Sequence, residues 1–190
     1  MRRLSMLTIL LAACGHHAAG EQGGADPGTG KPGMTVTSSA FAANAEIPAV
    51  HTCEGADVAP PLAWSGAPAT TKSFAVIVDD PDAPDPAAPT KTWVHWVLAN
   101  LSATTTELPA GAGGTPPAGA ATGTNDFGKL AWGGPCPPIG RHRYFFKVYA
   151  LDAEHLGTAG MTKGELLAAI TGHVVAKGEL VGTYAKKPAK

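Results

Sequence analysis

The sequence predicts a mostly β fold, in which antiparallel strands form the core and helix lies at the periphery near the C-terminus. Short apolar runs rich in β-branched and aromatic residues recur along the 190-residue chain, with Gly- and Pro-rich turns between them. Clear helical spacing of apolar residues appears once, late in the chain. The sequence has no regular strand–helix alternation and no internal repeat, which disfavours a parallel α/β sheet or a solenoid.

Six segments have the composition of strands. In chain order they are residues 34–41, 62–64, 74–78, 93–98, 143–151 and 179–184. The segment 143–151 gives the strongest signal because it combines aromatic and β-branched residues. We expect a loop or a sheet edge at residues 45–50 and a connecting segment at residues 101–109. The Gly- and Pro-rich residues 110–124 predict a surface loop with few core contacts.

The helical segment begins with a capping box. Thr162 has the N-cap position and Glu165 follows three residues later. Apolar residues then recur at helical spacing: Leu166, Leu167, Ile170, Val174 and Val175. We therefore expect a helix that stops near Gly178, and a shorter one over residues 152–156.

The first residues have the features of an export signal. Arg2 and Arg3 precede an apolar run that is too short to span a membrane, so residues 1–13 predict a signal peptide. The sequence Leu-Ala-Ala-Cys at 11–14 resembles a bacterial lipobox, which implies a lipid on Cys14; a plain secretory signal with an incidental cysteine is the alternative. We expect a flexible tether over 14–33, a domain over 34–186 and a basic tail over 187–190. This organisation predicts a lipid-anchored envelope protein with its domain in the periplasm or outside the cell.

Charge and cysteine content narrow the classes further. The formal net charge of −1 gives no reason to expect a nucleic-acid partner. If Cys14 carries a lipid, Cys53 and Cys136 remain, and an even number in an exported protein favours a disulfide. Two free thiols are the alternative.

Polar side chains stand at the ends of three predicted strands. Asp80 ends one apolar run, His95 lies in the next, and a proline-rich loop joins the two. His142 and Tyr144 share a face of the segment that follows. Two imidazoles and a phenol can donate to a phosphate, and Asp80 can orient an imidazole or accept from a ligand ammonium. Because a carboxylate favours a protonated imidazole, we expect tighter anion binding at mildly acid pH. The alternative to a binding site is that Asp80 only forms a turn and that the histidines are ordinary core residues.

Two ordered motifs resemble a known family. Asp-Pro-Asp-Ala-Pro at 80–84 with Trp-x-His at 93–95, and Gly-x-His-Arg at 140–143, look like the signatures of the phosphatidylethanolamine-binding, Raf-kinase-inhibitor-like proteins. Residues 125–128 and 133–138 resemble the bacterial branch. The resemblance covers about residues 35–185, and it implies a large central sheet packed on a smaller one, with helices near the C-terminus.

The resemblance also implies roles for individual residues. Those that fall on ligand-binding positions of the family are Asp80, His95, His142, Tyr144, Pro84 and Trp93. Asp82, Arg143 and Pro135 match positions that we expect to be structural supports, with Arg143 pairing a carboxylate. An insertion at 85–89 lengthens the loop beside this site.

Enzymatic readings find little support in the sequence. Asp80, His95 and His142 are zinc-type ligands, but no HExxH-like spacing accompanies them. A nucleophile elbow and phosphate-binding glycine motifs are also lacking. We therefore expect a non-enzymatic protein without catalytic residues, metal or cofactor, which binds a small anion or phospholipid headgroup. The alternative is an inhibitor of a kinase or protease that uses the pocket rim as its contact surface.

Overall fold

The computed structural model describes residues 31–187. The predicted signal peptide, Cys14, most of the tether and the last three residues of the basic tail lie outside this range. None of the helices within the range is long and apolar enough to cross a membrane.

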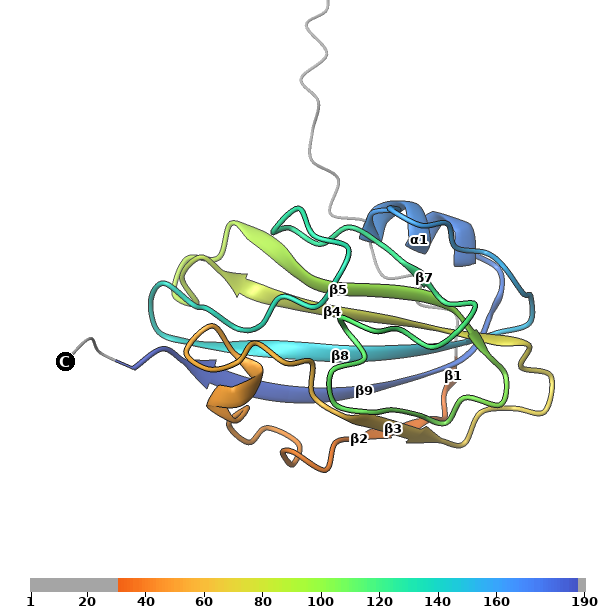
Figure 1. The fold of residues 1–190 in the computed structure, drawn as a ribbon, viewed down its shortest axis with the longest axis horizontal. Helices are drawn as coiled ribbons and strands as arrows, with labels where there is room; N and C mark the ends of the chain where they lie inside the picture. Colours follow the sequence, from red (N-terminus) through yellow and green to blue (C-terminus); the bar gives the residue numbers. More distant parts are fainter. Residues whose placement is uncertain (1–30, 188–190) are drawn as a thin grey trace, which may run out of the picture.

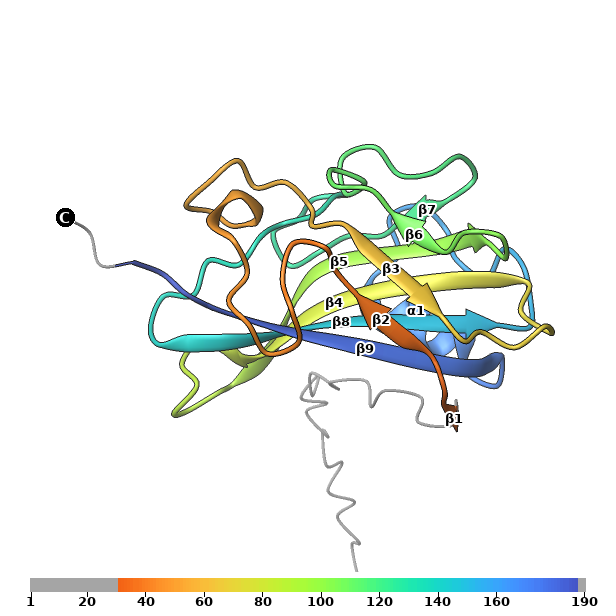
Figure 2. The ribbon, with the colours of Figure 1, turned by 90° about the horizontal axis from the view of Figure 1, so that it is seen from below.

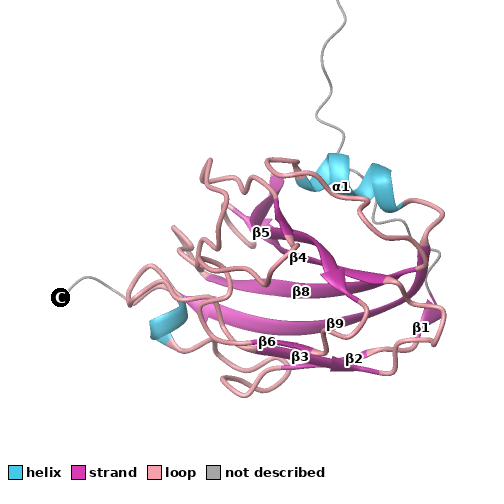
Figure 3. Ribbon diagram, turned by 45° about the vertical axis from the view of Figure 1, so that its right-hand side comes forward, coloured by secondary structure: helices cyan, strands magenta, loops and turns pink. Residues whose placement is uncertain are grey.

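The described chain forms two sheets and one α-helix in three layers (Figures 1 and 2). The larger sheet has the strand order β1-β9-β8-β4-β5-β7, and the smaller has the order β2-β3-β6. Figure 3 shows the smaller sheet on one side of the larger one and the helix on the other. The strands are β1 (Lys31–Pro32), β2 (Thr35–Thr37), β3 (Leu62–Ser65), β4 (Ser73–Ala83), β5 (Lys91–Ser102), β6 (Glu107–Leu108), β7 (Ala121–Thr122), β8 (Arg141–Leu151) and β9 (Val174–Ala185). The α-helix is α1 (Lys163–Ile170), and a short 3₁₀ turn is η1 (Ala49–His51). The predicted mostly β, two-sheet fold is confirmed.

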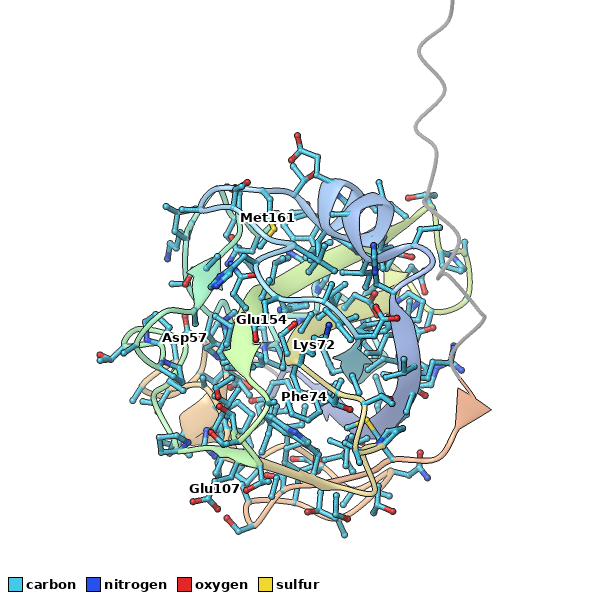
Figure 4. All side chains as sticks on the ribbon, turned by 90° about the vertical axis from the view of Figure 1, so that its right-hand side faces the viewer. Asp57, Lys72, Phe74, Glu107, Glu154 and Met161 are labelled. Atoms are coloured by element: carbon cyan, nitrogen blue, oxygen red, sulfur yellow. A yellow bond between two sulfur atoms is a disulfide. The ribbon has the colours of Figure 1, made fainter. Side chains whose placement is uncertain are left out.

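Strand β4 explains why the larger sheet is buried on both faces. Its side chains alternate, so that Val76 and Val78 face the smaller sheet while Ala75 and Ile77 face α1. Because both faces are covered, residues 74–78 of this strand form a continuous apolar run. Figure 4 shows Phe74 in the interior between the layers and Met161 beside the helix.

The helix is shorter than the apolar spacing predicts. The capping box forms as expected, with the Thr162 side chain accepting from the Glu165 N–H and Glu165 accepting from the Thr162 N–H. The helix nevertheless ends at Ile170, because Gly172 takes a positive φ of 85° and turns the chain. Val174 and Val175, expected in the helix, instead begin β9, where their β-branched side chains suit a strand paired with β8.

The second predicted helix, over 152–156, does not form. His155 has a positive φ of 55°, and His173 Nδ1 lies 2.9 Å from Asp152 Oδ1, so the segment makes a turn tied to the end of α1. The expectation of several peripheral helices is therefore wrong for residues 31–187, where one α-helix is present.

The segment expected to be a surface loop contributes to the core. Ala112 is buried, and β7 adds an edge to the larger sheet by pairing with β5. A Cβ on Gly113 would lie 2.3 Å from Trp132 Cβ, so the glycine allows close packing there. The predicted connecting segment likewise carries β6. The sequence predicted loops here because β6 and β7 are each two residues long, which is too short to show a strand pattern.

A disulfide joins two loops that are 83 residues apart in sequence, Cys53 to Cys136. The Cys53 N–H also donates to the Pro135 carbonyl at 3.1 Å. Next to the bridge, Glu54 accepts from the Tyr184 hydroxyl and, at 3.0 Å, from the Lys187 N–H. The bridge therefore belongs to a connection between the two loops and the end of β9.

We predict that loss of this bridge lowers the free energy of unfolding by about 2–4 kcal/mol, because a cross-link over a long loop restricts the unfolded chain. Urea unfolding of the Cys53→Ser/Cys136→Ser variant measures the difference, and thiol titration of the denatured, unreduced protein tests the bridge itself. Two reactive thiols at these positions would contradict it.

Candidate functional site

A pocket of about 390 Å³ lies at the end of the larger sheet where β4 ends and β5 and β8 begin. This is the end marked in Figure 1 by the arrowhead of β4 and the C-terminus. Three strands supply its polar side chains: Asp80 from β4, His95 from β5, and His142 and Tyr144 from β8. Pro84 and Trp93 also line it, so all six residues that the resemblance assigns to ligand binding converge on one cavity. The rest of its lining consists of Ala83, Thr90, Lys91, Phe127, Cys136, Pro137 and Pro138.

Asp80 and His142 form a buried pair in this wall. His142 Nδ1 lies 2.7 Å from Asp80 Oδ2, and His142 Nε2 lies 3.0 Å from the Ile139 carbonyl oxygen. Both partners are acceptors, so both ring nitrogens donate and the ring is an imidazolium. Asp80 Oδ1 accepts in turn from the Asp82 N–H at 2.8 Å. His142 therefore orients and neutralises Asp80, and it has no spare N–H for a ligand, contrary to the expectation that both histidines donate.

His95 is placed by a β-bulge. Val78 pairs with Trp96 and Asp79 pairs with Val94, so His95 is the extra residue opposite this step. The bulge turns both His95 and Trp96 toward the side of the smaller sheet, while Val97 packs on the helix side. Strict alternation along β5 would put His95 and Val97 on the same face of the sheet, but the bulge interrupts it and they lie on opposite faces.

The surroundings of His95 fix its protonation. Its Nδ1 lies 2.5 Å from the Gly133 carbonyl oxygen, and its ring packs against the rings of Phe127, Tyr144 and Trp132. Burial lowers the pKa of His95, although the hydrogen bond to Gly133 and the charge of Asp80 oppose the shift. The ring is thus neutral, with its proton on Nδ1 and a lone pair on Nε2. We expected the nearby carboxylate to favour an imidazolium here, but desolvation is the larger effect.

Two donors at the pocket are uncommitted. The Tyr144 hydroxyl and the Trp93 indole N–H are buried and have no hydrogen-bond partner within residues 31–187. Burial raises the pKa of Tyr144, so its hydroxyl keeps its proton. The Lys91 ammonium lies 3.8 Å from the Trp93 ring centroid at the mouth of the pocket. Both donors therefore lack an acceptor among the described residues.

Asp82 and Arg143, the expected supports, bind each other across β4 and β8. Asp82 accepts from the Arg143 backbone N–H at 2.9 Å, from Nε at 2.9 Å and from Nη2 at 2.6 Å. Arg143 holds the pKa of the Asp82 carboxyl below its ordinary value. This fork fixes the end of β4, and with it Asp80, against β8.

The inserted loop at 85–89, here called the rim loop, joins Pro84 and Thr90, which both line the pocket. Asp85 Oδ1 accepts from the Ala87 N–H at 2.9 Å, and Thr90 donates to the Ala83 carbonyl at 3.0 Å, so the loop closes on itself. A Cβ on Gly140 would lie 2.8 Å from Pro86 Cγ, and Gly140 has a positive φ of 74°. The loop therefore packs on the turn that leads into His142.

Asn125 and Gly133 contribute to the site without having been assigned a role from the sequence. The Asn125 amide donates to the Ala131 and His95 carbonyls and accepts from the Phe127 and Lys129 N–H groups, which fixes the loop that carries Phe127. Gly133 acts through its backbone, and a Cβ there would lie 2.5 Å from the Phe127 ring. The resemblance of residues 125–128 and 133–138 to the bacterial branch marked these positions, but it assigned them no role.

A zinc site, weighed from the sequence, would need Asp80, His95 and His142 as free ligands. Both His142 nitrogens are instead directed at protein oxygens. Within the part of the chain that the structure describes, no group of three His, Cys, Asp or Glu side chains is arranged to hold a metal ion.

Comparisons with known proteins agree with this architecture. The sequence profile of the family described as phosphatidylethanolamine-binding protein matches residues 37–185. The UPF0098 protein of Methanothermobacter thermautotrophicus is 42% identical over 153 residues, which cover 80% of this chain and 98% of that protein. A putative phosphatidylethanolamine-binding protein homolog from Chlamydia trachomatis has a crystal structure with a TM-score of 0.74 and 39% identity, covering 82% of this chain and 99% of that one. E. coli YbcL, described as a new member of the mammalian PEBP family, has a TM-score of 0.73 and 39% identity over 81% of this chain and 99% of its own.

We predict that Asp82→Asn lowers the free energy of unfolding at pH 7 by about 1.5–3 kcal/mol, since hydrogen bonds to a charged group are lost. The lowered pKa also gives the sign of the pH dependence. The contribution of Asp82 is complete above about pH 3.9, the unfolded value, and is lost as pH falls through the lower folded value. Urea unfolding between pH 7 and pH 2 should therefore show a smaller acid-dependent loss in the variant.

The matched control is Asp85→Asn, in the rim loop, where one local backbone hydrogen bond is affected. We expect it to change the free energy of unfolding by less than about 0.5 kcal/mol. Equal effects of the two substitutions would show that the fork with Arg143 has no special role.

Proposed function

The chain belongs to the phosphatidylethanolamine-binding protein family, and from that premise we propose that its pocket binds a small phosphate-bearing ligand without catalysing a reaction on it. The observation that carries the proposal is the buried Tyr144 hydroxyl, which lacks a partner within the described chain. A buried hydroxyl without a hydrogen bond costs roughly 1–3 kcal/mol. An oxygen of a bound phosphate supplies the missing acceptor.

The size and chemistry of the cavity support the same ligand class. A volume of about 390 Å³ suits a phosphate with a short substituent. Proline and aromatic side chains form most of the wall, which strengthens hydrogen bonds by excluding water. The paired charges of Asp80 and His142 cancel each other, so the negative carboxylate does not repel an entering anion at full strength.

The non-enzymatic part of the proposal rests on the commitments of the reactive groups. Cys136 is bonded to Cys53, and Asp80 is bound to His142. The Tyr144 hydroxyl is a weak nucleophile because burial raises its pKa. His95 is a base without a hydroxyl or thiol partner among its hydrogen bonds in residues 31–187.

We place the protein in the bacterial cell envelope, held by a lipid on Cys14. The lipobox-like sequence at 11–14 motivates the anchor. The Cys53–Cys136 disulfide supports an oxidising compartment, where such bonds persist. The ligand and the lipid bilayer are then the partners, and nothing in the formal charge of −1 calls for nucleic acid.

A second candidate is the inhibition of a kinase or protease through the rim. Phe127 lines the pocket with 40% of its surface exposed, and Ile139, whose carbonyl binds His142, is 56% exposed. Exposed apolar side chains beside a pocket are a common feature of protein interfaces. This function would tolerate loss of the Tyr144 hydroxyl, which separates it from ligand binding.

We predict that phosphorylethanolamine stabilises the full chain, purified in a phosphate-free buffer with mild detergent, against thermal unfolding. A ligand that binds only the folded state adds about 2.7 kcal/mol at 100 times its Kd. Tyr144→Phe should weaken binding by tenfold or more because it removes a donor to a charged oxygen. Its stability without ligand should not fall, since no protein hydrogen bond is lost.

The control is a second Tyr→Phe substitution, which should affect stability rather than ligand affinity. Tyr184 donates to Glu54, so Tyr184→Phe should lower the stability of the unliganded protein and leave ligand affinity unchanged. If millimolar ligand stabilises neither the original protein nor the Tyr184→Phe variant, phosphate binding is refuted and capture of an envelope protein by the rim becomes the next test.

A further inference from the structure

We propose that the pocket selects phosphate monoesters that carry a P–OH group, and discriminates against phosphodiesters such as the phosphate of an intact phospholipid. The inference rests on the proposed phosphate-binding function and specifies its ligand. It follows from the hydrogen-bonding roles that remain open in the pocket, which include an acceptor as well as donors.

The open acceptor is Nε2 of His95. The Gly133 carbonyl occupies Nδ1 at 2.5 Å and so holds the proton on that nitrogen. Gly133 and His95 are also joined by the Gly133 N–H, which donates to the His95 carbonyl at 3.0 Å. The ring therefore cannot rotate to present Nδ1 without breaking this connection. The atom that His95 can offer a ligand is a lone pair, and no hydrogen bond to it occurs within residues 31–187.

The carboxylates near His95 raise its pKa, but burial of the ring lowers the pKa by more, and each of these carboxylates has another partner. On β4, Asp80 is bound by His142, and Asp79 lies on the opposite face, bound by Lys147 and Lys163. The carboxylate of Asp126, in the loop that packs on β5, accepts from the Val94 N–H. From β8, the protonated Tyr144 packs against the His95 ring, and His142 stacks on Tyr144. No carboxylate in the described chain is thus hydrogen-bonded to His95, and the 2%-exposed ring lacks solvent to stabilise a charge.

The charged side chains around the pocket largely cancel one another, so little net positive charge remains to bind a doubly charged phosphate. The imidazolium of His142 is matched by Asp80, and Arg143 is matched by Asp82. Lys91 contributes a cation at the mouth, where it lies over the Trp93 ring. A singly charged phosphate therefore suits the interior better than a doubly charged one.

A phosphate monoester monoanion meets all of these roles at once. Its P–OH donates to His95 Nε2, and its other oxygens accept from the Tyr144 hydroxyl and the Trp93 indole. A phosphodiester has the same charge but no P–OH, so one of its oxygens would face the His95 lone pair. Sites that hydrogen-bond a ligand hydroxyl discriminate strongly against ligands that lack it, because a buried polar atom is left without a partner.

The test compares two ligands that differ in this one feature, phosphorylethanolamine and glycerophosphorylethanolamine, by calorimetric titration of the full chain. We expect the monoester to bind at least 100-fold more tightly at pH 6. Its affinity should fall about 50-fold between pH 6 and pH 8, because the fraction with a P–OH drops from about half to about 1% for a second pKa near 6. Vesicles of phosphatidylethanolamine should give no binding beyond that of phosphatidylcholine vesicles.

A substitution tests the role of His95 directly. The amide of Gln can rotate to donate or accept, so His95→Gln should reduce the monoester-to-diester affinity ratio at least tenfold. Tyr144→Phe should weaken both ligands alike and leave the ratio unchanged. If His95→Gln does not fold, the two-ligand comparison on the unmodified protein still decides the matter.

Equal affinities for the two ligands, or tighter monoester binding at pH 8, would overturn the inference and leave phosphate binding intact. Failure of both ligands to bind would refute the proposed function together with the inference. The two failures are therefore distinguishable.

Discussion

The pocket depends on the buried pair of Asp80 and His142. Removing two charges from water is costly, and such a pair is stable only when its remaining hydrogen-bonding groups are also satisfied. Here the Asp82 N–H and the Ile139 carbonyl supply those partners. The pair joins the end of β4 to the beginning of β8, and the adjacent fork of Asp82 and Arg143 repeats the connection on the outer side. Two strand ends that would otherwise fray are thereby held close enough to enclose a cavity.

Much of this arrangement could be predicted because the strands obey simple alternation. A period of two places His142 and Tyr144 on one face of β8, and the same reasoning places Val76, Val78 and Asp80 on one face of β4. The bulge at His95 could not be predicted in this way, because it depends on how β5 pairs with β4 and leaves no mark in the composition of either strand. The role of the Gly133 carbonyl could not be predicted either, because every residue has a backbone carbonyl and nothing in the sequence marks this one as the acceptor for His95.

The C-terminal part of the chain shows a different limit. Leu166, Leu167 and Ile170 have helical spacing and pack as a helix on the larger sheet. Val174 and Val175 continue the spacing by coincidence, and pairing with β8 outweighs any local helical tendency. Gly172 marks the boundary, but a lone glycine within an apolar pattern is weak evidence until its positive φ is known. The protonation state of His95 could not be predicted from the sequence either. The ring is neutral because it is buried, and the side chains that bury it include Phe127 and Trp132, which are distant in sequence.

The rim loop at 85–89 has a consequence for how such proteins diversify. The polar side chains of the pocket stand on strands, whereas this loop closes on itself and approaches the turn before β8 through Pro86 and Gly140. Changes in its length or sequence can reshape the entrance while the chemical base of the cavity stays fixed. A loop of another length at this point would give the cavity another entrance on the same base, so loop grafting offers protein engineers a route to reshape it.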